Sequence, residues 1–326
     1  MAQVTSETWD TRWSATRRSI DKTIVDNAFE PYRLLDLARK KWKKTYSGGT
    51  EISCLLESST VSAQAFDGWD QLDKSQADPI ETAHYLPRYY AVPIALSDTD
   101  SWENSGAEKV FDLLEAIGNN AFNSLLKAIN EDMGSAQAAK NILGLQDLIA
   151  DAAGATVGGI NSGTSTFWEN QRVTGSVDFL TQTATNVFNG IDSWNDGMDL
   201  ARIQGGNIVD MLTTYSIVKA YRIALSSQGY ARTAVDDAKG VGGDFNPMFY
   251  TAKVTADNDI AALHTYGISK GGLTLHVNSK ANFKKTPFVS TQSNGQLGQL
   301  GYMVAGVQVT TNQRRRNVVH TALTGS

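Results

Sequence analysis

A long polar loop between two strand-like segments is the feature that most limits how this chain can fold. Residues 50–57 and 80–96 both alternate apolar and polar side chains, the pattern of half-buried strands. The 22 residues between them, 58–79, are rich in Ser, Asp, Gln and Gly. A hairpin tip of this length is unusual in a compact domain, and such loops are commonly functional or mobile. The sequence therefore predicts a β-hairpin with an extended tip.

The second strand of this hairpin is expected at the edge of a sheet, because Pro87 and Pro93 cannot donate backbone hydrogen bonds. Along it, period two relates Leu86, Tyr90, Val92, Ile94 and Leu96. Residues 51–106 have a net charge of −8, so the hairpin and its surroundings are strongly acidic.

A long helix is predicted over residues 107–133. Ser105 and Glu108 have the spacing of a capping box at its start. Apolar residues then repeat with the helical period from Val110 to Ile129. At 1.5 Å per residue such a helix is about 40 Å long, which is unusual in a globular domain.

The remaining elements are read from shorter patterns. A helix is expected to begin at Glu30-Pro31 and to end in the basic run 39–44, whose cations suit the C-terminal end of a helix dipole. Residues 141–270 read as mixed α/β. The expected elements there and in the tail are helices over 177–194 and 215–227, and strands over 208–213, 273–277, 300–311 and 317–323.

Charge and composition exclude several classes of protein. The net charge is −5, distributed as +4 over residues 1–50, −12 over 51–160 and +3 over 161–326. A dedicated nucleic-acid binder is usually basic overall, so the net charge argues against that class. The single cysteine, Cys54, excludes an intramolecular disulfide and a cysteine-based zinc site. The sequence contains neither a run of ~20 apolar residues nor an apolar signal core, so we expect no membrane partner and synthesis in a cytoplasm.

No catalytic residue, cofactor site or metal site is predicted. Ser269 lies in the pattern Gly267-Ile-Ser-Lys-Gly271, which matches a hydrolase nucleophile elbow, but a strand-like segment follows it where that mechanism needs a helix. We therefore interpret this pattern as a turn. The four histidines lack metal-ligand spacing, and Asp192, Asp196 and Asp199 lack that of a calcium loop, so a solvated turn is expected there.

The order of these features resembles the major capsid proteins of tailed bacteriophages. The resemblance covers most of the chain from about residue 24 onward, and it depends on the order of several stretches more than on any single motif. The matching stretches are residues 26–57, 98–126, 141–146 ("NILGLQ"), 158–171 ("GGINSGTSTFWENQ") and 282–289 ("NFKKTPFV"), with the closing "NQRRRNVV".

The resemblance implies an α+β capsid fold, shared with encapsulin shells, in four parts. These are an N-terminal arm (1–45), an E-loop (46–104), a peripheral domain with a long spine helix (105–140 and 272–326) and an axial domain (141–271). It implies a structural protein of the virion that assembles with itself into hexamers and pentamers of an icosahedral head around double-stranded DNA. The alternatives are an encapsulin-type compartment and, less favoured, a hydrolase that uses Ser269.

The resemblance also implies partners. Only about 45 residues precede the expected E-loop, so a separate scaffolding protein is expected, with a portal and decoration proteins as further partners. The protein would be synthesised in the host bacterial cytoplasm.

Contacts between subunits are expected where the basic arm meets the acidic E-loop of a neighbour, with charges that steer the contact and apolar anchors that stabilise it. The Arg314–Arg316 triplet is expected to contact phosphate or an acidic chain, with a solvated hairpin tip as the alternative. The predicted contact residues are Arg39, Lys40, Lys41, Trp42, Lys43, Lys44, Phe66, Trp69, Arg314, Arg315 and Arg316.

Overall fold

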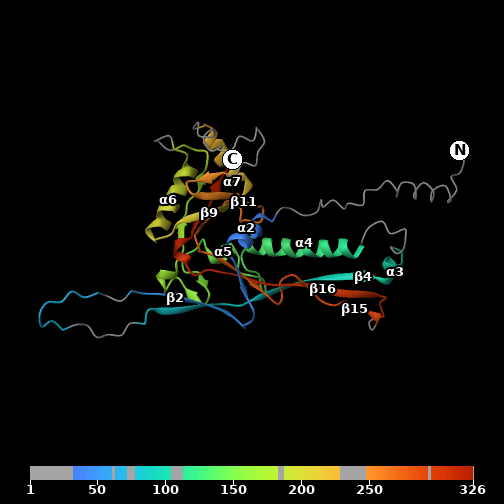
Figure 1. The fold of residues 1–326 in the computed structure, drawn as a ribbon. Coiled ribbons are helices and arrows are strands. Elements are labelled where there is room, and N and C mark those ends of the chain that lie inside the picture. The colour runs from blue at the N-terminus through green and yellow to red at the C-terminus, as the bar shows by residue number, and fades with distance from the viewer. Residues whose placement is uncertain are drawn as a thin grey trace. The chain divides into compact units, whose positions relative to one another are not determined.

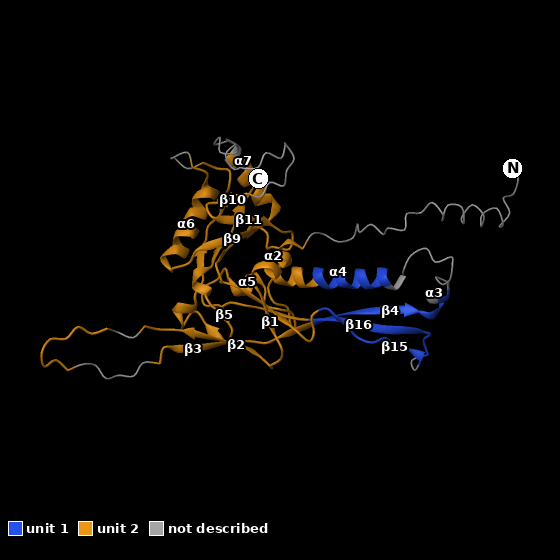
Figure 2. Cartoon of the chain, in the orientation of Figure 1, with its two compact units in different colours: residues 1–31, 90–127, 283–305 blue, residues 32–89, 128–282, 306–326 orange. Residues whose placement is uncertain are grey.

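The computed structural model describes residues 32–60, 63–71, 78–103, 113–182, 187–227, 247–292 and 295–325 (Figure 1). The chain divides into two compact units, coloured separately in Figure 2. Unit 1 contains residues 1–31, 90–127 and 283–305, and unit 2 contains residues 32–89, 128–282 and 306–326. The predicted capping box at Ser105 and Glu108, and the start of the first helix at Glu30-Pro31, lie outside the described residues.

In unit 1, strands pair along the first part of β16 (Gly298–Thr310). Strands β14 (Lys284–Lys285) and β15 (Val289–Ser290) both pair with it antiparallel, and β4 (Arg88–Ser97) also pairs with it. The short helix α3 (Asp98–Glu103) follows β4.

The predicted long helix is confirmed within the described residues. Helix α4 (Leu113–Gly134) is continuous through Gly118, where glycine costs up to about 1 kcal/mol relative to alanine. The ring of Phe122 packs edge-on against Phe283, with 5.1 Å between centroids, and this contact helps to fix the helix in unit 1.

The predicted hairpin is formed by β2 (Ile52–Glu57) and β3 (Ile80–Tyr85), which pair antiparallel in unit 2. The expected second strand is in fact two strands, β3 and β4, separated at Pro87. Because the alternation restarts after the proline, Ala83 and Tyr85 are buried and Leu86 is exposed, so Leu86 does not belong to the period-two pattern that continues from Tyr90 to Leu96. In β4 the predicted period-two pattern from Tyr90 to Leu96 is confirmed, because these positions are the more buried ones.

The main sheet of unit 2 has the strand order β10-β11-β9-β12-β17-β7. The predicted strand over 208–213 is β9 and the predicted helix over 215–227 is α7 (Tyr215–Ser227), so both are confirmed. Helix α6 (Asn189–Ile203) packs on β17 and β7, and α7 packs on β11. Both helices join one apolar cluster with the sheet, in which the rings of Trp194 and Tyr221 lie 5.0 Å apart. The other strands of this sheet are β7 (Gln171–Val173), β10 (Met248–Phe249), β11 (Ala252–Ala256), β12 (Thr265–Ser269) and β17 (Val318–His320).

Smaller elements complete unit 2. The tail strand predicted over 317–323 is divided between β17 and β18, and the strand predicted over 273–277 is β13. Strand β1 pairs parallel with β13, which pairs with the last part of β16. The remaining bounds are α2 (Arg33–Lys41), β1 (Lys43–Tyr46), α5 (Leu145–Leu148), β5 (Thr156–Val157), β6 (Ile160–Asn161), η2 (Thr166–Trp168), β8 (Val177–Asp178), β13 (Thr274–Asn278), η5 (Arg314–Arg316) and β18 (Leu323–Thr324).

Two predicted helical segments are extended instead. Residues 177–182 are not helical, because the chain pairs here with its own C-terminal tail: the Phe179 N–H donates to Thr324 O, and β8 pairs with β18. Phe179 is buried against Gly190, where a Cβ atom would lie 2.1 Å from the ring. The basic run also leaves the helix early. Helix α2 ends at Lys41, and Lys43–Tyr46 form β1.

Candidate functional site: a basic groove

Helix α2, which carries part of the basic run, is held at its start by side chains from two distant elements. The Leu34 N–H donates to Asp257 Oδ2 at 2.8 Å, and the Leu35 N–H donates to Asn130 Oδ1 at 2.9 Å. Asn130 Nδ2 also donates to Asp257 at 3.2 Å. Since Tyr32 supplies no side-chain cap, these acceptors satisfy N–H groups that every helix leaves open at its first turn. The Asp257 carboxylate also suits the positive end of the helix dipole.

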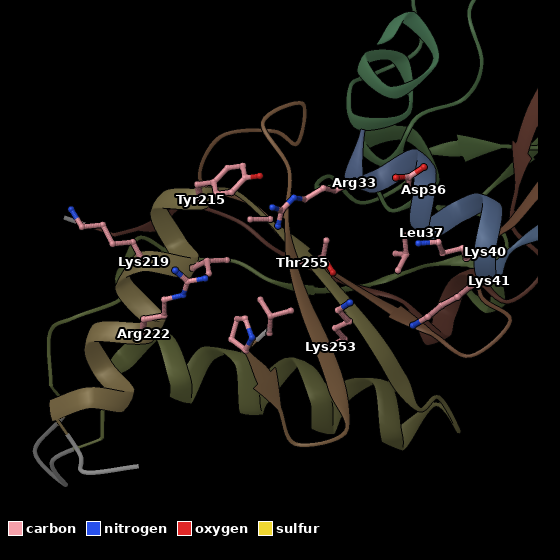
Figure 3. Close-up of a pocket in the computed structure, with 14 residues that line it drawn as sticks. Arg33, Asp36, Leu37, Lys40, Lys41, Tyr215, Lys219, Arg222, Lys253 and Thr255 are labelled. Carbon is pink, nitrogen blue, oxygen red and sulfur yellow. The ribbon is translucent and has the colours of Figure 1, made fainter. Parts of the chain in front are cut away.

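A groove with a volume of about 310 Å³ lies between α2, α7 and β11, all within unit 2 (Figure 3). Among the described residues that line this groove, Asp36 alone is acidic. We call this feature the basic groove, after its six cationic residues: Arg33, Lys40, Lys41, Lys219, Arg222 and Lys253.

The cations reach the basic groove because both helices are amphipathic. Arg33 and Lys40 are seven residues apart on α2, and residues at this spacing lie on one face of a helix. Tyr215, Lys219 and Arg222 are similarly spaced on α7. The opposite faces are buried and apolar, with Leu34, Leu35 and Ala38 on α2 and Ile217, Ala220, Tyr221 and Ala224 on α7.

Two contacts fix cations at the edges of the basic groove. Lys41 Nζ forms an ion pair with Asp210, whose side chain is fully buried in β9. The Arg33 guanidinium lies over the ring of Tyr215, 5.7 Å from its centroid, in a cation–π arrangement. Lys41 is thus largely neutralised by its partner, and the groove lining as a whole holds six cations against the single carboxylate of Asp36. The basic groove is therefore suited to attract an anion.

Arg314 lies in a different environment, inside the molecule. Its side chain is 0% exposed, and it donates from Nε to Leu148 O at 2.9 Å and from Nη1 to Trp168 O at 3.1 Å. Burial lowers the pKa of Arg314 to about 10, partly offset by nearby Tyr85, which raises it. Tyr85 is itself buried and donates to Thr311 O. Arg314 thus joins α5, η2 and η5 through backbone carbonyls and does not reach the surface.

The structure places the predicted contact residues in several different environments. Trp42 (7% exposed) and Arg314 are buried within this chain, so they do not form an outer surface. Lys40 and Lys41 line the basic groove, whereas Phe66 (65% exposed) and Trp69 (102%) lie in the hairpin tip. Lys43 and Lys44 are in β1, and Arg39 is an exposed residue of α2. Arg315 and Arg316 line a second pocket beside Leu55 and Phe167.

Four residues of the basic groove were not predicted from the sequence: Arg33, Lys219, Arg222 and Lys253. The spacing of Lys219 and Arg222 opposite the apolar stripe of α7 was a usable signal for a basic helix face. Nothing in the local sequence indicates that this face lies opposite α2, because that depends on contacts between segments about 180 residues apart.

Comparison with protein-family models and with curated protein sequences finds no match for this chain. Solved structures do match over nearly its whole length. The capsid asymmetric unit of cyanophage A-1(L) matches with a TM-score of 0.68 and 16% identity, over 96% of this chain and 99% of that chain. The capsid of the native GTA particle matches with a TM-score of 0.62 and 13% identity, over 98% of each chain.

This chain has the phage-capsid fold. The same fold includes the SrpI encapsulin of Synechococcus elongatus, which matches with a TM-score of 0.62 and 9% identity over 96% of each chain. The α+β capsid fold expected from the sequence is therefore confirmed.

Within the phage-capsid fold of this chain, Ser269 is an internal residue. It is buried at the end of β12, and its hydroxyl donates to Asn317 Oδ1 at 3.0 Å. His264 instead contacts Asp151 at 2.8 Å, and His276 packs against Tyr46. The matched capsid structures are those of structural proteins, which fits the prediction that this chain is not an enzyme.

The three aspartates predicted to lie in a solvated turn, Asp192, Asp196 and Asp199, are instead on helix α6. Burial and the two neighbouring aspartates raise the pKa of Asp196. No group of His, Cys, Asp and Glu suited to hold a metal ion occurs in the described part of the chain. Among the described helices, none is both long and apolar enough to cross a membrane.

Proposed function

We propose that this protein is a major capsid protein, which assembles with itself into hexamers and pentamers of an icosahedral phage head that encloses double-stranded DNA. The observation that carries this proposal is the match to the cyanophage A-1(L) capsid over 96% of this chain and 99% of that one. A likeness over whole chains favours a shared architecture of the entire subunit, whereas a shared domain alone would give a partial match.

The four-part division belongs to the same proposal: an N-terminal arm (1–45), an E-loop (46–104), a peripheral domain (105–140 and 272–326) and an axial domain (141–271). The β2–β3 hairpin and its tip fall in the proposed E-loop, and α4 falls in the proposed peripheral domain. The β9–β12 part of the main sheet, with α6 and α7, falls in the proposed axial domain. The proposed partners are other copies of this chain, packaged DNA, a separate scaffolding protein, a portal and decoration proteins, and the proposed location is the virion after synthesis in the host cytoplasm.

The exposed aromatic residues of the hairpin tip support assembly with other copies. Phe66 and Trp69 place large apolar surfaces in water, and clusters of such surface commonly mark sites of protein association. A two-stranded hairpin is also only marginally stable by itself in water, so this segment would gain stability from a surface to lie on.

Electron microscopy of the expressed full chain tests this proposal. We expect shells or ring-shaped capsomers, whereas only small globular particles under all assembly conditions would contradict it. Particles from infected cells then separate the two shell functions. Nucleic acid inside them is expected for a phage head, whereas protein cargo without DNA would favour an encapsulin-type compartment.

A further inference from the structure

We infer that the basic groove binds the phosphate backbone of double-stranded DNA. This inference rests on the proposed function, and it assigns to particular residues a contact that the capsid proposal leaves unplaced. The groove residues come from three elements of unit 2: α2, α7 and β11 (Figure 3).

The first argument is the charge of the basic groove. Six cations and one carboxylate line it, and one of the six, Lys41, is paired with the buried Asp210. The chain as a whole is acidic, so this local excess of positive charge is not a consequence of its composition. Like charges gathered in one groove repel one another, and a bound anion would offset this repulsion. Phosphate oxygens are such an anion, and lysine and arginine are their usual partners.

The second argument is the spacing of the cations. Arg33 and Lys40 are seven residues apart on α2, which corresponds to about 10 Å along the helix axis. Lys219 and Arg222 lie on the face of α7 that lines the groove, and Lys253 lies between the two helices on β11. One strand of a DNA duplex places a phosphate every ~3.4 Å along the helix axis, so roughly three phosphates span the length of α2 that carries these charges. The two rows of cations thus suit a repeating polyanion.

The third argument separates DNA from an acidic protein segment. A protein partner normally inserts apolar or aromatic anchors into pockets. In the basic groove Leu37, Val218, Val254 and Ala256 are all buried, and the one exposed aromatic ring, that of Tyr215, lies under the Arg33 guanidinium. Recognition by charge alone, without apolar anchors, is typical of sequence-independent binding to a nucleic-acid backbone.

The test compares two variants of the full chain before assembly. The groove variant carries Lys40→Gln, Lys219→Gln and Lys253→Gln. The control variant carries Lys140→Gln, Lys270→Gln and Lys280→Gln, three exposed lysines of unit 2 outside the groove, so both variants change the net charge equally. Lys41 is left unchanged, because its removal would leave the buried Asp210 without its partner.

Fluorescence anisotropy of a labelled 20-base-pair duplex gives the affinity between 50 and 200 mM salt, and circular dichroism checks that both variants are folded.

For the groove variant we expect roughly tenfold weaker binding at 50 mM salt, and a slope of log K against log salt that is smaller by up to about 2.7, or 0.9 for each lost phosphate contact. The control variant is expected to keep most of the parent's slope. Equal slopes for the two variants, or no binding of DNA by the parent, would overturn the inference. A competition experiment gives a further test, in which poly-glutamate and unlabelled duplex are compared at equal concentrations of negative charge. If poly-glutamate displaced the labelled DNA from the parent more effectively than the unlabelled duplex did, the inference would also be overturned, because the groove would then prefer an acidic protein ligand.

Electron microscopy of the parent keeps the two proposals apart. If the parent forms shells but the two variants bind DNA alike, the groove assignment fails and the capsid proposal stands. If the parent binds DNA through the groove but forms no shells or capsomers, the capsid proposal fails and the groove remains a DNA-binding site.

Discussion

Arg314 shows how a charged side chain can act as part of a core. Its guanidinium is buried, and its described hydrogen bonds all go to backbone carbonyls, including Ala155 O at 3.3 Å. The planar guanidinium presents several donors in a fixed geometry, and an ammonium cannot reproduce this arrangement. We therefore expect Arg314→Lys to lower the free energy of unfolding by roughly 3 kcal/mol, since hydrogen bonds from charged groups contribute about 1.5–3 kcal/mol each and are not additive.

The neighbouring residue provides the control for Arg314. Arg315 is exposed, so Arg315→Lys is expected to change the unfolding free energy by less than about 0.5 kcal/mol. Urea unfolding of the unassembled chain, followed by circular dichroism, measures both variants. Equal midpoints for the two would show that the buried guanidinium does not stabilise the fold.

His320 predicts a dependence of stability on pH. Its side chain is buried beneath Gly197, where a Cβ atom would lie 2.3 Å from the imidazole, and its Nδ1 lies 3.3 Å from Ser193 Oγ. Burial lowers the pKa of His320 to about 3. Between pH 6.5 and about 3 the unfolded chain therefore binds a proton at this residue and the folded chain does not, so stability must fall as the pH falls through this range.

The expected loss is about 1.4 kcal/mol per pH unit below 6.5, because one pKa unit corresponds to 1.36 kcal/mol. Unfolding free energies measured from pH 7 to 5 for the parent and for His320→Gln isolate this contribution, since the carboxylates are common to both. The two curves should converge as the pH falls. Parallel curves would mean that His320 takes up a proton in the folded state.

At the scale of elements, the attachment of α2 depends on acceptors from outside the helix. Asp257→Ala removes the acceptor of the Leu34 N–H, and loss of a helix cap typically costs about 0.5–2 kcal/mol. We expect amide hydrogen exchange in residues 34–38 to accelerate in this variant, while β9 keeps its protection. Asp257→Asn retains an acceptor oxygen but not the charge, so an intermediate effect is expected.

Asp151→Ala is the matched control for this element. Asp151 is an exposed carboxylate that contacts His264 and not α2. Exchange in α2 should be the same in this variant as in the parent. If Asp257→Ala also leaves exchange in α2 unchanged, the remote cap does not hold the helix.

The elements that could be predicted from the sequence are those whose pattern is local. Strand β9 and helix α7 have clear apolar patterns, and helix α4 has an unbroken helical period, so all three were predicted near their observed positions. The elements that were missed depend on distant partners. Strand β8 pairs with a strand about 145 residues away, and β1 pairs with β13, so tertiary contacts override local preference in both cases.

The same reasoning applies to the candidate site. Lys40 and Lys41 stand in a conspicuous basic run, whereas Arg33, Lys219 and Lys253 are isolated in the sequence. They become one groove only when α2 is attached beside the main sheet through Asp257 and Asn130. Arg314 was predicted to be a surface contact because it stands in a triplet, and a run of arginines does not indicate which member turns inward.

At the scale of the whole molecule, charge is distributed unevenly along the chain, with −8 over residues 51–106 and +4 over residues 1–50. Opposite charges on neighbouring copies can steer association, but exposed ion pairs contribute only about 0–1 kcal/mol each. Most of the stability of an assembled shell must therefore come from buried apolar surface. The exposed aromatic residues of the hairpin tip are the clearest described source of such surface in the acidic segment.

Phe66→Ser with Trp69→Ser is therefore expected to reduce assembly strongly while leaving the fold of the unassembled chain unchanged. Burial of one large apolar side chain contributes about 1.5–3 kcal/mol, so loss of both side chains would weaken each subunit contact by several kcal/mol.

Ile203→Ser is the control, because Ile203 is 76% exposed at the end of α6, away from the hairpin. Light scattering measures the assembled fraction against protein concentration. The hairpin variant should require at least a hundredfold higher concentration, since every 1.4 kcal/mol corresponds to a factor of ten. If the hairpin variant assembles at the same concentration as the control, Phe66 and Trp69 are not anchors between subunits.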